Sequence, residues 1–239
     1  MESFVQQFLS ESSAAPKTPA RKSTKISAKT NESKEKTELE TEQEKRHRQL
    51  SEYQEITKKM SIQNSQTTNE LFANNPNLWH QYHDARDFSF LGYKEQEEIP
   101  VNKIISYLKT KENRRLRILD LGCGRNQISK YFESNRNFDI TGYDHISHNG
   151  SVACDISNLP DENESVNICI FSQSLMGQNW QKYILEAKRV LIFNGMIIIS
   201  ESSERYNIIK EFVKEIGFKI LDDQYDPTNR WFYIYGINN

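Results

Sequence analysis

The middle of the chain contains the stretch Leu116-Arg117-Ile118-Leu119-Asp120-Leu121-Gly122-Cys123-Gly124. Its apolar run predicts a buried strand, and a helix is expected to follow from Gln127 to Phe132. Glycines let the backbone approach a ligand closely, and the start of a helix offers N–H groups without internal partners. Position 127 is Gln and no Lys-Ser/Thr pair follows, so the G-x-G-x-x-G and P-loop motifs are both absent. The stretch predicts a ligand site at the end of a strand.

Strands and helices alternate from this stretch onward, which is typical of a mainly parallel sheet covered on both faces. One of the last two strands is expected to be antiparallel, because only the short turn Asp226-Pro227-Thr228-Asn229 joins them. The sequence predicts an α/β fold, a doubly wound sheet of about seven strands with a small N-terminal helical cap. The expected strands are 116–121, 138–143, 152–154, 167–171, 196–200, 218–222 and 231–237. The expected helices are 68–73, 78–83, 99–108, 127–132, 180–190 and 204–216.

Composition changes near residue 60. Only 36% of the 239 residues are hydrophobic, below the roughly 45–50% apolar share of globular domains. Residues 1–60 are expected to be a disordered, partly basic tail, with a possible solvated helix over 40–60. Within Pro16–Lys36, seven basic residues face two acidic ones, so this part is either a solvated linker or a segment that contacts phosphate. Residues 61–110 are expected to form the cap or entry segment, and 111–239 the ligand-binding domain.

Several classes of protein are disfavoured. No run of 18 apolar residues is present, and the N-terminus lacks the pattern of a secretory signal. The three cysteines, Cys123, Cys154 and Cys169, have no metal-ligand spacing. We therefore expect an intracellular protein with neither a disulfide framework nor a metal site.

Polar side chains at the ends of the next strands predict a nucleoside pocket. Asp144 lies 20 residues after Gly124, where a carboxylate can accept hydrogen bonds from ribose hydroxyls. Asp155 could accept from an adenine amine and Ile156 could pack on its ring, although either aspartate could instead begin a turn or cap a helix. Small polar residues over 171–177 close the fourth strand. Because strand ends converge in a parallel sheet, and no pyrophosphate motif is present, S-adenosylmethionine is favoured over NAD.

Longer motifs occur between residues 67 and 237, and the most specific is the Ser-Leu-Met-Gly-x-Asn block that follows the fourth strand. The motif segments are Trp79-His80-Gln81-Tyr82-His83-Asp84, Cys154-Asp155-Ile156, Leu159-Pro160, Glu164-Ser165-Val166, Ser174-Leu175-Met176-Gly177 with Asn179, Glu186-Ala187-Lys188-Arg189-Val190-Leu191, Glu201-Ser202-Ser203-Glu204-Arg205-Tyr206 and Gly217-Phe218-Lys219-Ile220. With these segments, residues 67–237 resemble the family of ribosomal RNA-processing protein 8 (nucleomethylin), whose members are S-adenosylmethionine-dependent methyltransferases.

The resemblance implies a Rossmann-like class I methyltransferase fold and an activity, methylation of nitrogen 1 of an adenine in large-subunit ribosomal RNA in the nucleolus. Some family members are instead linked to silencing of ribosomal DNA through chromatin. The resemblance implies cofactor contacts at His83, Gly122, Asp144, Asp155, Ile156 and Ser172. Gly124, in the glycine turn, is a further candidate cofactor contact. No catalytic base is named, because nitrogen 1 of adenine already carries a free lone pair. Asn179 and Asp155 are candidates for positioning the base.

The chain departs from the family pattern in the glycine turn and after His83. Arg125 stands where the family has an acidic residue, and Ala85-Arg86-Asp87-Phe88-Ser89-Phe90 replaces Gly-Phe-Arg-x-Gln-Val. The Arg125 cation would repel the methionine ammonium group if the two approached, or it points outward toward RNA phosphate. Two functions are therefore open, an active methyltransferase and a cofactor-binding scaffold on pre-ribosomes or ribosomal-DNA chromatin. Tyr82, Phe88, Phe90 and Tyr93 are candidates either for stacking on a flipped adenine or for packing.

Overall fold

The computed structural model describes residues 42–90, 95 and 98–239. The expected disordered tail up to residue 41 and the stacking candidate Tyr93 lie outside the described residues. None of the helices described is both long and apolar enough to cross a membrane.

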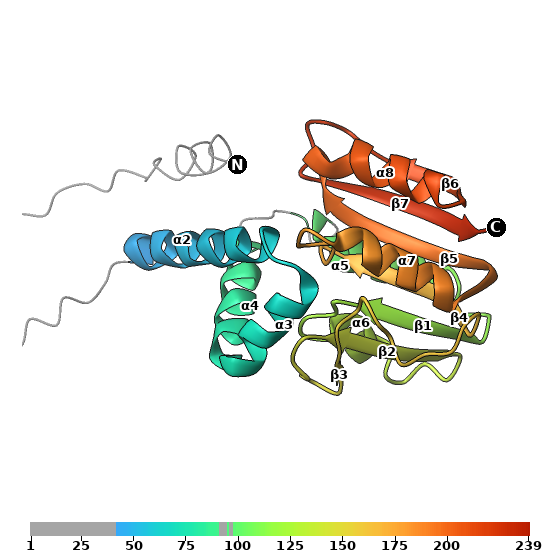
Figure 1. The fold of residues 1–239 in the computed structure, drawn as a ribbon, viewed down its shortest axis with the longest axis horizontal. Coiled ribbons are helices and arrows are strands. Elements are labelled where there is room, and N and C mark those ends of the chain that lie inside the picture. Colours follow the sequence, from blue (N-terminus) through green and yellow to red (C-terminus); the bar gives the residue numbers. More distant parts are fainter. Residues whose placement is uncertain (1–41, 91–94, 96–97) are drawn as a thin grey trace, which may run out of the picture. The chain divides into compact units, whose positions relative to one another are not determined.

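Seven strands form one sheet in the order β3-β2-β1-β4-β5-β7-β6 (Figure 1). The first five strands run parallel, and β7 pairs antiparallel with both β5 and β6. This confirms the expected strand count and the antiparallel strand at the C-terminus. The bounds are β1 Leu116–Leu121, β2 Phe138–Asp144, β3 Val152–Ala153, β4 Val166–Ser172, β5 Leu191–Ser202, β6 Phe218–Gln224 and β7 Trp231–Asn238.

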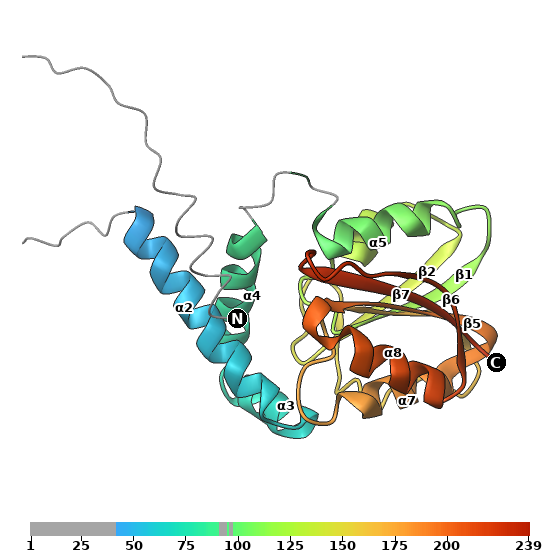
Figure 2. The same ribbon diagram turned by 90° about the horizontal axis from the view of Figure 1, so that it is seen from above.

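Helices cover both faces of the sheet because residues alternate along its strands. In β1, Ile118 points to the face that carries α5 (Pro100–Lys109) and α6 (Gln127–Tyr131). Its neighbours Leu119 and Leu121 point to the opposite face, against α7 (Trp180–Val190) and α8 (Tyr206–Glu215), which follows a 3-10 turn over Ser203–Arg205. Figure 2 shows α5 on one side of the sheet and α7 and α8 on the other. The doubly wound architecture is confirmed.

Three helices precede the sheet domain: α2 (Glu42–Ser61), α3 (Ser65–Asn74) and α4 (Pro76–Phe90). The side chain of Asn64 caps α3 by accepting from the Thr67 N–H at 2.8 Å, and a proline begins α4, where its missing N–H costs little. α4 continues past the expected end at residue 83 and includes residues 84–90.

The expectation of a solvated helix over 40–60 is wrong for the second half of α2. Ile56 and Met60, four residues apart, lie on one side of the helix and are 5% and 6% exposed. They pack with Phe72, Trp79 and Tyr82 of α3 and α4. The helix itself is present as expected. The division of the chain into segments at residues 60 and 110 stays a prediction.

Candidate functional site

The turn after β1, Gly122-Cys123-Gly124, is closely packed against two other parts of the chain. Gly122 and Gly124 have φ angles of +76° and +54°, which disfavour any side chain. A Cβ on Gly122 would lie 2.3 Å from the Ser174 Cβ, and one on Gly124 would lie 2.7 Å from Cε1 of His83. Glycine at these positions thus lets the loop after β4 and helix α4 pack against the turn.

The N–H groups of this turn are already bonded within the protein. Those of Gly122 and Cys123 donate to the Tyr143 carbonyl, and that of Gly124 donates to Oδ2 of Asp144 at 2.8 Å. These three N–H groups are therefore not free donors for a ligand. The expectation of unpaired N–H groups concerned the start of the following helix and stays a prediction.

Asp144 lies at the end of β2, is 7% exposed, and joins three parts of the chain. Its Oδ1 accepts from the Trp79 indole N–H at 2.7 Å and from the His145 N–H at 2.8 Å, while Oδ2 accepts from Gly124. An ionised carboxylate has about four acceptor positions, so one is left for a ribose hydroxyl. Binding of both hydroxyls requires Trp79 to release its hydrogen bond.

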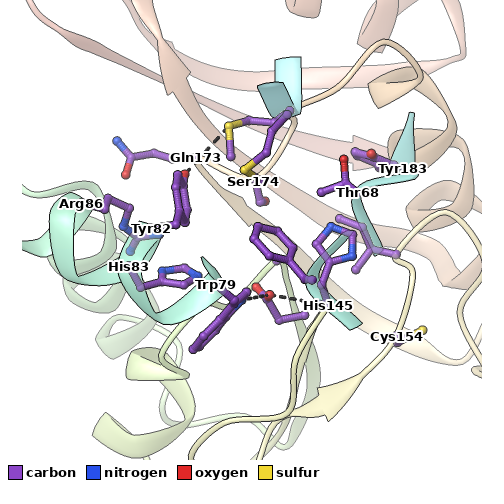
Figure 3. A pocket seen from close by; sticks show the side chains of 16 residues that line it. Thr68, Trp79, Tyr82, His83, Arg86, His145, Cys154, Gln173, Ser174 and Tyr183 are labelled. Atoms are coloured by element: carbon purple, nitrogen blue, oxygen red, sulfur yellow. Dashed lines mark hydrogen bonds between the residues drawn. The ribbon is translucent and has the colours of Figure 1, made fainter. Parts of the chain in front are cut away.

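Asp144 is among the residues that line a cavity of about 50 Å³, and Figure 3 shows Trp79 and His145 at the same cavity. Small-molecule sites measure about 300–1,000 Å³, so a nucleoside would have to displace side chains that line this space. The cavity is lined by residues of the N-terminal helices and of the strand ends, namely Met60, Thr68, Phe72, Trp79, Tyr82, His83, Arg86, Gly122, Asp144, His145, Cys154, Ile156, Gln173, Ser174, Met176 and Tyr183.

The structure brings together four of the predicted site residues, His83, Gly122, Asp144 and Ile156. Gly124 lies next to them, beneath the ring of His83. Asp155 does not line the cavity; its Oδ1 accepts from the Ser157 N–H at 2.9 Å, as expected of a turn-forming aspartate. Ser172 does not line it either, whereas the next two residues do. Cofactor contacts of these residues stay a prediction.

Several polar atoms that face this region are buried without a hydrogen-bond partner in the described part of the chain. They include Nδ1 of His83, Nε2 of Gln173 and Oγ of Ser174. Unpaired buried polar atoms are costly and therefore rare in folded proteins. Burial, followed by the charges of Arg86 and Arg125, holds the pKa of His83 well below its usual value. His83 is therefore neutral at physiological pH, and its free Nδ1 is available to a ligand.

Arg125 pairs with two carboxylates of α4. Its guanidinium hydrogen-bonds to Asp84, and its Nε lies 3.0 Å from Oδ2 of Asp87. Asp87 belongs to the segment of α4 that departs from the family pattern, and Asp84 directly precedes that segment. Arg125 thus joins the glycine turn to α4 and is paired within the protein.

Asn179 fastens the N-terminal helices to the loop after β4. Its Oδ1 accepts from the Ser65 N–H and its Nδ2 donates to the Ser65 Oγ, both at 2.9 Å. The next residue upstream, Gln178, donates its N–H to the Gln63 carbonyl at 2.8 Å. Asn179 is therefore hydrogen-bonded to Ser65 at the start of α3. Its role in positioning the target adenine stays a prediction.

Sequence reasoning missed Arg86 as a member of the site. Trp79, His83 and Arg86 stand at positions i, i+4 and i+7, so they lie on one face of α4. That spacing was the signal available in the sequence. Among the stacking candidates, Tyr82 lines the cavity, whereas Phe88 and Phe90 are not among its lining residues.

The fold defines the class of protein. A methyltransferase from Burkholderia thailandensis that acts on nitrogen 1 of 1,6-didemethyltoxoflavin is similar with a TM-score of 0.55 and 17% identity, covering 69% of this chain and 86% of that one. A TehB-like S-adenosylmethionine-dependent methyltransferase from Corynebacterium glutamicum has a TM-score of 0.55 and 16% identity, over 69% and 100% of the two chains. The chain therefore has a methyltransferase fold.

The sequence profile of a family described as "Hypothetical methyltransferase" matches residues 38–238, and the chain belongs to this family. The match begins well before the expected residue 67 and includes α2. One relative is the 25S rRNA (adenine(645)-N(1))-methyltransferase of Schizosaccharomyces pombe, which is 32% identical over 63% of this chain and 50% of its own length. Another is ribosomal RNA-processing protein 8 of Dictyostelium discoideum, which is 36% identical over 69% of this chain and 41% of its own length. The expected resemblance is confirmed, and the chain spans about half the length of these relatives.

Proposed function

We propose that the protein transfers the methyl group of S-adenosylmethionine to nitrogen 1 of an adenine in large-subunit ribosomal RNA. The observation that carries the proposal is the buried Asp144, held against the glycine turn at the end of β2 in a chain of this methyltransferase family. The substrate is proposed from the name of the Schizosaccharomyces pombe relative.

The chemistry of the cavity fits this cofactor. Asp144 retains an acceptor position for ribose, and Ile156 offers an apolar surface for the adenine ring. The unpaired atoms of Gln173 and Ser174 can hydrogen-bond to polar groups of the ligand. Gly122 lines the cavity, and the absence of a side chain there allows Ser174 to pack against the glycine turn. The rings of Phe72 and Trp79 move aside when the nucleoside enters.

Bound S-adenosylmethionine supplies a methyl group on a positively charged sulfur. The protein binds and orients the two reactants and excludes water, because nitrogen 1 of adenine needs no base to make it nucleophilic. Tyr82 lines the cavity and can stack on an adenine extruded from its helix. Burial raises the pKa of Tyr82 well above its usual value, so its hydroxyl stays neutral.

The pairing of Arg125 favours an active enzyme over a scaffold. The scaffold hypothesis rested on Arg125 and on the altered segment after His83. Asp84 and Asp87 offset the charge of Arg125, and Asp87 lies in that altered segment. The substitutions in the glycine turn and in α4 thus compensate each other electrostatically.

Ribosomal RNA is the proposed partner, with pre-ribosomal proteins in addition, and the nucleolus is the proposed location. Residues 61–239 carry 19 basic and 23 acidic side chains, so this part does not attract phosphate as a whole. The basic segment Pro16–Lys36 is proposed to supply part of the attraction. No group of three His, Cys, Asp or Glu residues suited to a metal is found within the described ranges.

Methyl transfer in vitro tests the proposal. The full chain is incubated with S-adenosylmethionine and large-subunit ribosomal RNA lacking the modification, and the nucleosides are analysed by mass spectrometry. N1-methyladenosine is the expected product. Its loss in Asp144→Ala, but not in Asp161→Ala, would support the role of Asp144, because both carboxylates are 7% exposed and only Asp144 lines the cavity. An unmethylated RNA with the wild-type chain would refute the proposal.

A further inference from the structure

Arg86 is a cation of the cavity that the proposed function does not yet use. It lies on α4, one turn after Tyr82, and its side chain is 12% exposed. Figure 3 shows it at the opposite end of the cavity from Cys154. Cys154 and Ile156 mark the end at which adenine is expected. Arg86 therefore lies where the other end of an elongated nucleoside ligand would be.

The charge of Arg86 is poorly offset within the protein. Its Nε is buried without a hydrogen-bond partner in the described part of the chain. The nearest carboxylate is that of Asp87, whose Oδ1 is 3.9 Å from Nε of Arg86, whereas Oδ2 of Asp87 is 3.0 Å from Nε of Arg125. A largely buried cation without a close partner is costly. An anionic group of a ligand would remove that cost.

A second unpaired nitrogen lies close to the guanidinium. The point that a Cβ on Gly124 would occupy is 3.1 Å from Nδ1 of His83 and 3.5 Å from Nη1 of Arg86. Nδ1 of His83 is likewise buried without a partner, and a neutral imidazole can carry its proton on this atom and donate it. Two potential donors thus converge over the glycine turn.

We propose that Arg86, together with Nδ1 of His83, binds the carboxylate at the amino-acid end of S-adenosylmethionine. The inference rests on the proposed function and adds a specificity-determining residue to it. A guanidinium presents N–H groups in a planar fork that matches a carboxylate with two parallel hydrogen bonds. The ring of Phe90, 5.7 Å from the guanidinium carbon, helps to orient this fork. Arg86 lies in the segment of α4 that departs from the family pattern.

Two ligands that differ at the amino-acid end test the proposal. S-adenosylhomocysteine contains the amino-acid carboxylate, and methylthioadenosine keeps the nucleoside and sulfur but lacks that end. Both are titrated calorimetrically into the full-length wild type, Arg86→Gln and Arg86→Lys. We expect Arg86→Gln to weaken S-adenosylhomocysteine at least tenfold and methylthioadenosine less than twofold, with a smaller selective loss in Arg86→Lys. Unchanged binding of methylthioadenosine also shows that the variant is folded.

Arg125→Gln is the matched control, because it removes a neighbouring guanidinium that Asp84 and Asp87 already pair. It is expected to change the affinities for the two ligands by the same factor. The proposal would be overturned if Arg86→Gln lowered the affinity for both ligands equally, or if it lowered neither. It would also be overturned if this variant lost RNA binding while its affinity for S-adenosylhomocysteine stayed the same. Failure of the wild type to bind either ligand would overturn the proposed function and this inference with it.

Discussion

Trp79 donates a hydrogen bond to Asp144, the carboxylate that we propose binds the ribose of the cofactor. The indole N–H occupies one acceptor position of a carboxylate that is otherwise held by backbone N–H groups. The same bond stabilises the packing of α4 on the sheet and restricts the carboxylate available to ribose. If Asp144 binds ribose as proposed, this hydrogen bond and the ligand compete for the same carboxylate.

Replacing Trp79 with Phe should lower the free energy of unfolding by about 1.5–3 kcal/mol, because a hydrogen bond to a charged group is lost while an aromatic ring is kept. Denaturant unfolding measures the change. Trp180→Phe is the control, since Trp180 is also buried and its indole has no recorded hydrogen bond within the described residues. Equal losses in the two variants would contradict this role of Trp79.

Asp120 makes the stability of the fold depend on pH. It is 2% exposed, and burial, followed by the charge of Asp144, raises its pKa to about 7. A carboxyl group whose pKa is higher in the folded than in the unfolded state stabilises the protein fully below pH 4. This contribution is lost as the pH rises through about 7.

Asp120→Asn should therefore be more stable than the wild type at pH 8, by up to about 4 kcal/mol, and the difference should shrink toward pH 4. Urea unfolding at a series of pH values measures it. A difference that is the same at pH 5 and pH 8 would show that the carboxyl group does not titrate in this range.

At the scale of elements, ion pairs fasten α4 to the glycine turn. Arg125→Glu would place three carboxylates together and should lower the free energy of unfolding by roughly 1–2 kcal/mol, since solvent screens the partly exposed groups. Asp87→Arg in the same chain should restore at least half of that loss. Thermal unfolding of the wild type, both single variants and the double variant measures the coupling. Strictly additive losses would mean that the two residues do not interact.

The sheet could be predicted from the sequence, because its short apolar runs and glycine turns are local signals. The same holds for the convergence of Gly122, Asp144 and Ile156, since the ends of parallel strands meet at one edge. The burial of Ile56 and Met60 could not, because it depends on contacts with α3 and α4. The partners of Arg125 lie about 40 residues away in the sequence, so their side chains come together only in the folded protein.

The fifth strand shows a second limit of local signals. The fifth strand was expected to begin at Met196. β5 instead begins at Leu191, which pairs with Val166 before an irregularity in the register. Asp155 was ambiguous in the same way, because a carboxylate after a strand suits both ligand binding and a turn, and the structure shows the hydrogen bond of a turn.

At the scale of the whole molecule, charge separates the basic segment from the rest of the chain. Deleting residues 1–40 should weaken RNA binding at low salt and reduce the slope of log affinity against log salt, by up to about 5 if all seven basic residues of Pro16–Lys36 contact single-stranded phosphates. Filter binding at several salt concentrations measures the slope. The same slope without the segment would place the phosphate contacts on residues 41–239.

The central claim, methylation of an adenine in large-subunit ribosomal RNA, is tested most directly in cells. The gene is deleted, and the nucleosides of that RNA are quantified by mass spectrometry. We predict that N1-methyladenosine is lost and that it is restored by the wild-type chain and by Asp161→Ala, but not by Asp144→Ala. A nucleoside profile that is unchanged by the deletion would contradict the claim.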